Sequence, residues 1–176
     1  MLFRSIEFSG ADVDRDTLSF TFSNPAKGSV VDNGNGTFTY TPDANANGSD
    51  SFTITANDGT VDVTETVNVT VNAVNDAPTI TSTAVTSVNE DSAYSYTLTT
   101  SDVDADTVAP SAVTLPSWLS FDQSTGILSG TPTNDDVGVH DVTLRVNDGT
   151  VNVDQSFKVT VTNTNDAPTI TTTTSL

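Results

Sequence analysis

The chain has 176 residues, no cysteine, and 23 acidic against 5 basic side chains, which gives a formal net charge of −18 at pH 7. Nucleic acid and an anionic membrane surface are therefore poor partners, because few cations are present to neutralise phosphate. Disulfides cannot stabilise the fold, and no apolar run is long enough to span a bilayer.

The sequence repeats itself at an offset of 90 residues: residues 57–61 recur as 147–151, and residues 75–80 recur as 165–170. A repeat at this period is typical of a tandem array of domains. We expect two modules, residues 1–75 and 76–165, followed by residues 166–176 as the start of a further linker or strand. Counting back by this period places the counterpart of Glu90 before Met1. We therefore expect the first module to be cut off inside its opening strands, and residues 1–5 do not resemble the rest.

Strand patterns follow in chain order. In the first module, residues 33–36 have the Asn-Gly pairs of a hairpin turn, and Phe52 and Ile54 alternate with polar residues before a turn at Asp58-Gly59. Valines then alternate from 61 to 71, and the second module repeats this pattern between residues 142 and 161. Short strands and frequent turns without a helical period predict an all-β fold. We expect each module to be a β-sandwich.

Acidic residues concentrate in short loops of these modules. Asp102, Asp104 and Asp106 alternate with small residues, and Asp148 lies at the turn of the last hairpin. Loops of a sandwich gather at its two ends, so both loops could share the end that faces the joint at residues 75–78. Carboxylates and carbonyls are the ligands that Ca²⁺ prefers. Asp-Gly pairs and acidic runs also occur as plain turns and solvated loops, but their identical spacing in both modules favours a metal site.

The sequence resembles cadherin repeats, and more closely the bacterial cadherin-like tandem repeats of large surface adhesins. In the first module the resemblance rests on residues 36–42, Gly-Thr-Phe-Thr-Tyr-Thr-Pro, and on Asp50-Ser51-Phe52. The second module is similar to the dystroglycan-type cadherin-like domain through residues 115–119, Leu-Pro-Ser-Trp-Leu, and Thr131-Pro132.

This resemblance implies two tandem Ig-like or cadherin-like Greek-key β-sandwiches joined end to end. It also implies that calcium is bound at each joint from both sides. The first joint would use the linker, two loops of the second module and the middle of the first module, that is, Asn75, Asp76, Asp102, Asp104, Asp148 and Asp32. The second joint would hold half a site, formed by Glu90, Asp122, Asn165 and Asp166. A further half-site at the start of the first module would comprise Asp12, Asp14 and Asp58. Ser124 stands where the family motif has a second acid, so we expect one or two ions per joint.

We therefore expect a calcium-rigidified segment of an extracellular, secreted or cell-surface adhesin, whose partners are neighbouring repeats of the same chain and a surface protein or carbohydrate. One alternative is a carbohydrate- or protein-binding module that uses Trp118 as a platform, although Trp118 followed by Leu119 favours a place in the core. Another is a spacer within a large secreted enzyme. We expect no intrinsic enzyme activity, because the only histidine, His140, accompanies no nucleophile motif.

Overall fold

The computed structural model describes residues 4–170 of the chain. They are almost entirely β-strand and loop, with one short 3₁₀ turn, η1 (Asn134–Asp136). The chain divides between Val74 and Asn75 into two compact units, Met1–Val74 (unit 1) and Asn75–Leu176 (unit 2). The predicted all-β sandwich fold is confirmed.

Unit 1 consists of two three-stranded sheets. One has the order β1-β4-β3, from Arg4–Glu7, Thr37–Pro42 and Gly28–Asp32. The other has the order β2-β5-β6, from Ser19–Phe22, Gly48–Asn57 and Asp62–Val71. The expected turns lie between β3 and β4 and between β5 and β6. Strand β6 is an edge strand, since β5 is its only partner among the described residues.

Aromatic side chains fill the space between these two sheets. Phe38, Tyr40 and Phe52 are buried, and Phe8 and Phe22 pack against them. The rings of Phe38 and Phe52 meet edge to face with centroids 5.2 Å apart, a favourable arrangement for aromatic pairs. Alternate residues of strand β4 are buried in this core, because successive side chains of a strand point to opposite faces of the sheet.

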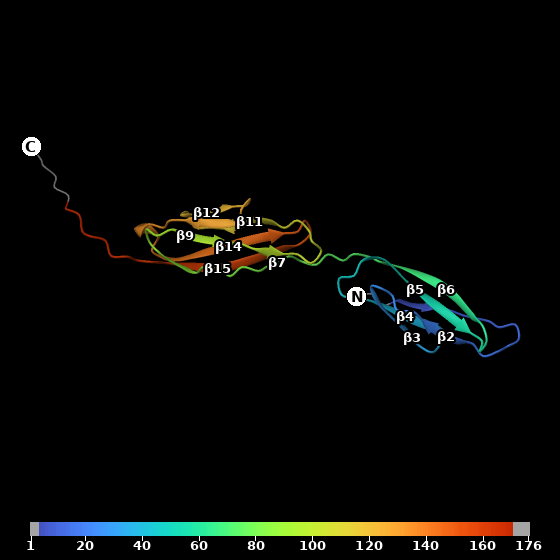
Figure 1. Ribbon diagram of the computed structural model, residues 1–176. Coiled ribbons are helices and arrows are strands. Elements are labelled where there is room, and N and C mark those ends of the chain that lie inside the picture. The colour runs from blue at the N-terminus through green and yellow to red at the C-terminus, as the bar shows by residue number, and fades with distance from the viewer. Residues whose placement is uncertain (1–3, 171–176) are drawn as a thin grey trace, which may run out of the picture. The chain divides into compact units, whose positions relative to one another are not determined.

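Unit 2 has a four-stranded sheet of order β11-β14-β15-β8, formed by Ala109–Thr114, Gly138–Asn147, Asn152–Thr162 and Ser87–Asn89. The long β14–β15 hairpin forms its centre, and β8 joins β15 in parallel. A three-stranded sheet has the order β12-β13-β9, from Leu119–Asp122, Ile127–Gly130 and Tyr94–Thr97. Two short strands, β7 (Thr79–Ile80) and β10 (Thr100–Ser101), pair separately. Figure 1 shows these strands running lengthwise through the unit.

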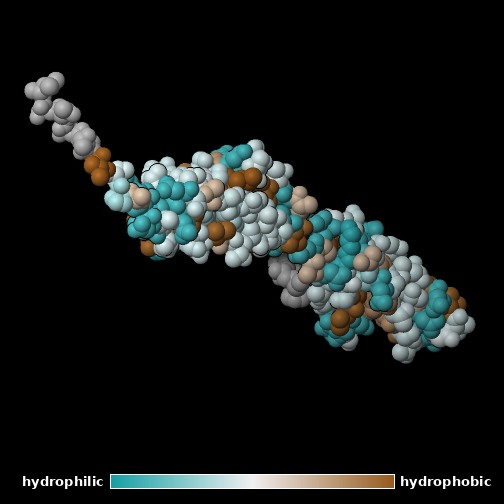
Figure 2. Space-filling view, turned by 60° about the vertical axis from the view of Figure 1, so that its left-hand side comes forward, coloured by the Kyte–Doolittle hydropathy of each residue, from teal (hydrophilic) through white to brown (hydrophobic). Residues whose placement is uncertain are grey.

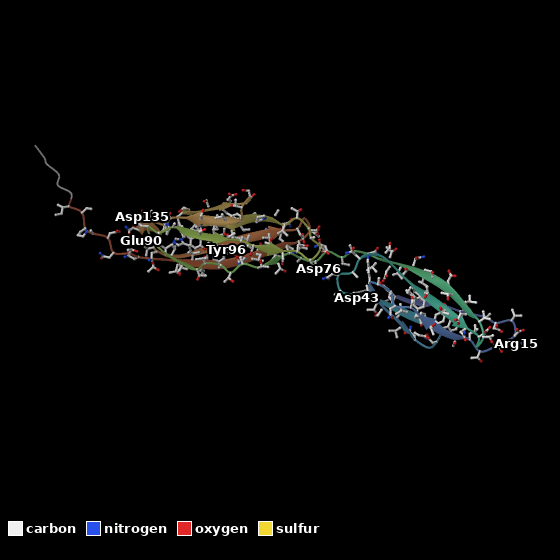
Figure 3. All side chains as sticks on the ribbon, in the orientation of Figure 1. Arg15, Asp43, Asp76, Glu90, Tyr96 and Asp135 are labelled. Atoms are coloured by element: carbon white, nitrogen blue, oxygen red, sulfur yellow. The ribbon has the colours of Figure 1, made fainter. Side chains whose placement is uncertain are left out.

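The core of unit 2 lies between its two larger sheets. Leu128, Leu144 and Val159 are fully buried there. Residues that precede β9 close one side of this core, because Ile80, Ala84 and Val88 pack against it. The visible surface of both units is mainly hydrophilic or near-neutral, with small separate hydrophobic patches (Figure 2). The loops that connect the strands therefore lie at the two ends of each unit, and the candidate site residues lie in or beside these loops (Figure 3).

Candidate metal site

The loop between β10 and β11 gathers three carboxylates. The Asp102 Oδ1 atom accepts the backbone N–H of Asp104 at 2.9 Å and that of Asp106 at 3.3 Å. Between them, Ala105 takes a left-handed conformation with φ of 62°, which turns the chain back on itself. Each of the three aspartates consequently places one carboxylate oxygen within 4.8 Å of the others.

Asp148 comes to this end of unit 2 from the β14–β15 turn. Its Oδ1 atom accepts the backbone N–H of Thr150 at 2.7 Å and that of Val151 at 2.6 Å. Its Oδ2 atom accepts the side-chain amide of Asn75 at 2.9 Å. The Asn75 amide, followed by the two backbone donors, lowers the pKa of Asp148, so this carboxylate is ionised at neutral pH.

Residues 75 and 76 join the two loops. While Asn75 contacts Asp148, the backbone N–H of Asp76 donates to Asp104 Oδ2 at 2.7 Å. The chain is then held in place by the buried ring of Pro78 and by the pairing of Thr79 with Ser101. The structure therefore brings together the five residues expected from the second module and the joint. It also adds Asp106 to this group. In the sequence, Asp106 is indicated by its alternation with Asp102 and Asp104.

One oxygen in this cluster lacks a partner. Asp102 Oδ2 is buried and accepts no hydrogen bond from any described residue. A buried acceptor without a partner is costly, and the neighbouring carboxylates add repulsion. A cation bound by oxygen would remove both penalties. The oxygen ligands present here, three carboxylates with the Asn75 amide and the Asp76 carbonyl in the adjoining segment, are of the kind that Ca²⁺ prefers, so these residues fit calcium.

Two loops of unit 1 have the same conformation as their counterparts in unit 2. Asp12 Oδ1 accepts the backbone N–H of Asp14 at 2.8 Å and of Asp16 at 3.1 Å, and Arg15 is left-handed as Ala105 is. Asp58 Oδ1 accepts the N–H groups of residues 60 and 61. Nevertheless, among residues 4–170 only residues 102, 104 and 106 form a close group of three carboxylates.

The opposite end of unit 2 contains most of the second expected set. Glu90 is 1% exposed, its Oε1 accepts the backbone N–H of Thr164, and its Oε2 is buried without a partner among the described residues. Asp166 accepts the side-chain amide of Asn134 at 2.6 Å, and Asn165 donates to the Asp166 backbone oxygen. Figure 3 shows Glu90 and Asp76 at opposite ends of the unit, with Tyr96 between them.

The structure corrects the expected places of Asp122 and Asp32. Asp122 lies in the turn near the end of β9, where the Gly126 oxygen accepts the N–H of Leu98. Glu90 lies near the start of β9, where the N–H of Asp91 donates to the Pro132 oxygen. Asp122 is thus separated from Glu90, Asn165 and Asp166 by the length of a strand.

Asp32 is displaced in the same way within unit 1. Its turn lies beside Phe8, which accompanies Asp12 and Asp58 around one pocket. Strand β6 instead ends at Val71, paired with Gly48 at the other end of the unit. Asp32 therefore lies at the end of unit 1 opposite to Val71, after which the linker begins.

Trp118 does not form an exposed platform. Its ring meets Tyr94 and His140 edge to face, with centroids 5.8 Å away in both cases, and it packs against the core of unit 2. Its indole N–H is buried without a partner among the described residues. Stacking of a sugar on this ring is therefore disfavoured, as expected from its neighbour Leu119.

Comparison with protein families agrees with this architecture. Residues 8–72 match the family described as "Cadherin-like domain", and residues 77–162 match the family described as "Putative Ig domain". These matches support a cadherin-like repeat. A comparison with curated proteins finds no match.

Solved structures resemble the chain in fold. The human protocadherin-24 EC1-2 structure aligns with a TM-score of 0.53 at 20% identity and covers 88% of this chain and 86% of that one. The protocadherin γB4 extracellular domain gives a TM-score of 0.53 at 16% identity, covering 82% of this chain and 27% of that one. An endo-fucoidan hydrolase of glycoside hydrolase family 107 has 26% identity but a TM-score of 0.46, over 86% of this chain. The chain spans only 24% of that hydrolase.

No helix among the described residues is long and apolar enough to cross a membrane.

Proposed function

We propose that the chain is a pair of repeats from an extracellular adhesion-type protein, and that unit 2 binds Ca²⁺ at the end where it begins. The ligands would be Asn75, Asp76, Asp102, Asp104, Asp106 and Asp148. The observation that carries this proposal is the buried, unpartnered Asp102 Oδ2 within a group of converging carboxylates. The cadherin-like match and the protocadherin folds support the adhesion-type class.

The residues of the site hold the joint to unit 2 without the ion and would hold it more firmly with the ion bound. Without calcium, Asn75 and the Asp76 N–H tie the joint to Asp148 and Asp104 by two exposed hydrogen bonds. Rotation of the Asn75 amide would present its oxygen instead of its nitrogen to the same place. Calcium would then neutralise the aspartates and hold residues 75 and 76 more firmly to unit 2, which shortens the free connection between the modules.

Glu90, Asn165 and Asp166 would form half of a second site, completed by a module that follows. The matching half is already present in unit 1 as Asp12, Asp14 and Asp58, whose loops have the conformation of their counterparts in unit 2. Neighbouring repeats of the same chain are therefore the first partners we propose, at an extracellular location. The packing of Trp118 gives no support to a carbohydrate platform.

Isothermal calorimetry on two variants tests the calcium site. Asp104→Asn removes a charge from the proposed site, and we expect it to weaken Ca²⁺ binding at least ~10-fold, which corresponds to about 1.4 kcal/mol. Asp14→Asn makes the same change at the equivalent position of unit 1, whose described aspartates form no close group of three, and should leave the main binding event unchanged. Equal affinity for calcium in the wild type and Asp104→Asn, or no binding at millimolar Ca²⁺, would overturn the proposal.

A further inference from the structure

The printed sequence has its Asn-Gly pairs in unit 1 and none in unit 2. The pairs are Asn33-Gly34, Asn35-Gly36 and Asn47-Gly48. The first two lie in the turn between β3 and β4, and the third lies where β5 begins. In such a pair the glycine nitrogen can attack the side-chain amide carbon of the asparagine, because glycine has no Cβ atom to obstruct the approach. The three pairs are alike in sequence, so the fold decides which of them reacts.

This attack has two structural requirements. The backbone N–H of the glycine must be free to lose its proton, because its nitrogen is the nucleophile. The side-chain oxygen of the asparagine gains negative charge during the attack, so hydrogen-bond donors to this oxygen stabilise the transition state.

Asn35-Gly36 meets both requirements. Thr37 donates twice to the Asn35 Oδ1 atom, through its backbone N–H at 3.2 Å and through its hydroxyl at 2.7 Å. The Gly36 N–H donates to no described residue, although the Gly36 oxygen accepts the N–H of Phe8 at 2.9 Å. Asn35 and Gly36 are both exposed, so water reaches them. The turn therefore polarises the amide of Asn35 and leaves the nucleophile free.

Asn33-Gly34 is restrained at both of its reacting groups. The Gly34 N–H donates to the Asp32 Oδ1 atom at 2.9 Å, and this carboxylate opposes loss of the proton. The Asn33 amide nitrogen donates to the hydroxyls of Thr37 at 2.8 Å and Thr39 at 3.2 Å. The Asn33 Oδ1 atom accepts one long contact, from the Thr39 hydroxyl at 3.3 Å. We therefore expect Asn33 to react slowly in the folded chain.

Asn47-Gly48 is restrained by the sheet. The N–H of Thr53 donates to the Ser23 side chain and its C=O accepts the Ser23 N–H, so both groups of Thr53 point away from β6. Hydrogen-bonding direction alternates along a strand, so the Gly48 N–H points toward Val71, its partner on β6. Lys27 Nζ contacts the Asn47 backbone oxygen at 2.7 Å, not its side chain. This contact makes the Gly48 N–H more acidic, but the pairing with β6 holds the nitrogen away from attack.

We propose that Asn35 deamidates spontaneously in the folded protein, ahead of Asn33 and Asn47. The Gly36 nitrogen loses its proton and bonds to the Asn35 Cγ atom, the Cγ–Nδ2 bond breaks, and ammonia leaves with that proton. The cyclic imide that remains then adds water at either of its two carbonyls. Opening at one carbonyl gives aspartate at residue 35, and opening at the other gives isoaspartate. Water is the only co-reactant.

Deamidation would change the charge and the length of this turn. It adds a carboxylate at residue 35 to a turn that already contains Asp32, and isoaspartate also inserts a methylene group into the main chain between β3 and β4. The 90-residue repeat places Thr125-Gly126 at the corresponding position of unit 2. Thr125 has no side-chain amide, so the modification would distinguish unit 1 from unit 2.

Mass spectrometry of the folded chain after incubation in mildly alkaline buffer tests the order of reaction. Fragmentation of its peptides locates the converted residue, and synthetic peptides identify isoaspartate. We expect residue 35 to convert at least ~10-fold faster than residues 33 and 47, which corresponds to about 1.4 kcal/mol of activation free energy. In the control, the chain unfolded in urea should convert all three at similar rates. Conversion of residue 33 or 47 as fast as residue 35 in the folded chain would overturn the proposal.

Substitutions of Thr37 test whether its contacts polarise Asn35 or only restrain it. Thr37→Val removes the hydroxyl donor and keeps the side-chain shape, and we expect it to slow conversion of residue 35 in the folded chain about 10-fold. Thr37→Ser keeps the donor and should retain the wild-type rate. Faster conversion in Thr37→Val than in Thr37→Ser would show that the contacts protect Asn35 and would overturn the proposal. The wild-type comparison of folded and unfolded chains decides the order of reaction even if Thr37→Val fails to fold.

Discussion

Asp50 is a buried acid inside unit 1. Although it is only 8% exposed, it accepts hydrogen bonds from the Tyr40 hydroxyl at 2.8 Å and from the backbone N–H groups of Ala26, Lys27 and Ser51. Burial alone would raise the pKa of Asp50, but these donors outweigh it and lower the pKa. Conversely, burial followed by the Asp50 contact raises the pKa of Tyr40 to about 12. The carboxylate therefore ties β5 to the loop before β3.

We expect Asp50→Asn to lower the unfolding temperature of unit 1 by several degrees at pH 7, because an amide nitrogen would face backbone donors. Since the folded pKa of Asp50 lies below its unfolded value, the carboxylate's contribution is fully present above about pH 4. This contribution is lost as the pH falls through the folded pKa. The difference from wild type should therefore shrink in acid. Circular dichroism melts from pH 7 to 3 measure this, with exposed Asp43→Asn as the control; a difference independent of pH would contradict the assignment.

The buried position of Asp50 was available from the sequence. Asp50, Phe52 and Ile54 alternate on one face of a strand, and the latter two indicate the core side. Its hydrogen-bond partners are not predictable from the sequence, because Tyr40 and the loop at residues 26–27 become neighbours of Asp50 only through tertiary packing. By contrast, the group of Asn75, Asp76, Asp104 and Asp148 was predictable, because repeated turn motifs place their loops at one end of a sandwich.

At the scale of the strand, the sequence predicts the hairpins well, but it does not predict at which end of a unit a given loop lies. The alternating valines and the Asp148-Gly149 turn define β14 and β15 locally. The place of Asp122 depends instead on how many times the chain crosses the unit. β11 runs away from the Asp102 loop, and β12 returns in the other sheet, so Asp122 comes back to the end near Leu98. No local pattern between residues 109 and 122 records that reversal.

Strand β13 passes very close to the loop that contains Trp118. A Cβ atom added at Gly130 would lie 2.0 Å from the backbone oxygen of Trp118. We expect Gly130→Ala to destabilise unit 2 by about 1–3 kcal/mol, since the loop or the strand must move apart. Urea unfolding followed by the fluorescence of Trp118, the only tryptophan, measures this. The neighbouring exposed Thr131→Ala should change the free energy of unfolding little; equal effects of both changes would contradict the close approach.

At the scale of the whole molecule, the chain has two separate cores. We expect two unfolding transitions, of which only that of unit 2 responds to calcium, because all proposed ligands of its site follow Val74. At 100 times the dissociation constant, Ca²⁺ should stabilise unit 2 by about 2.7 kcal/mol. Differential scanning calorimetry resolves both transitions, and Trp118 fluorescence identifies the one belonging to unit 2.

Excess EDTA provides the control for this measurement, because it should return the unit 2 transition to its calcium-free temperature. A single transition, or an equal calcium shift in both, would show that the two units do not unfold independently.

The parallel pairing of β8 with β15 has a mechanical consequence. Thr160, Val161 and Thr162 face Ser87, Val88 and Asn89 in order, so the first strands of unit 2 and its last strand run in the same direction. Tension applied to the two ends of the unit pulls β8 and β15 in opposite directions along their common axis. Their hydrogen bonds are loaded together in shear rather than opened one after another. Unit 2 should therefore resist stretching along the direction of β8 and β15.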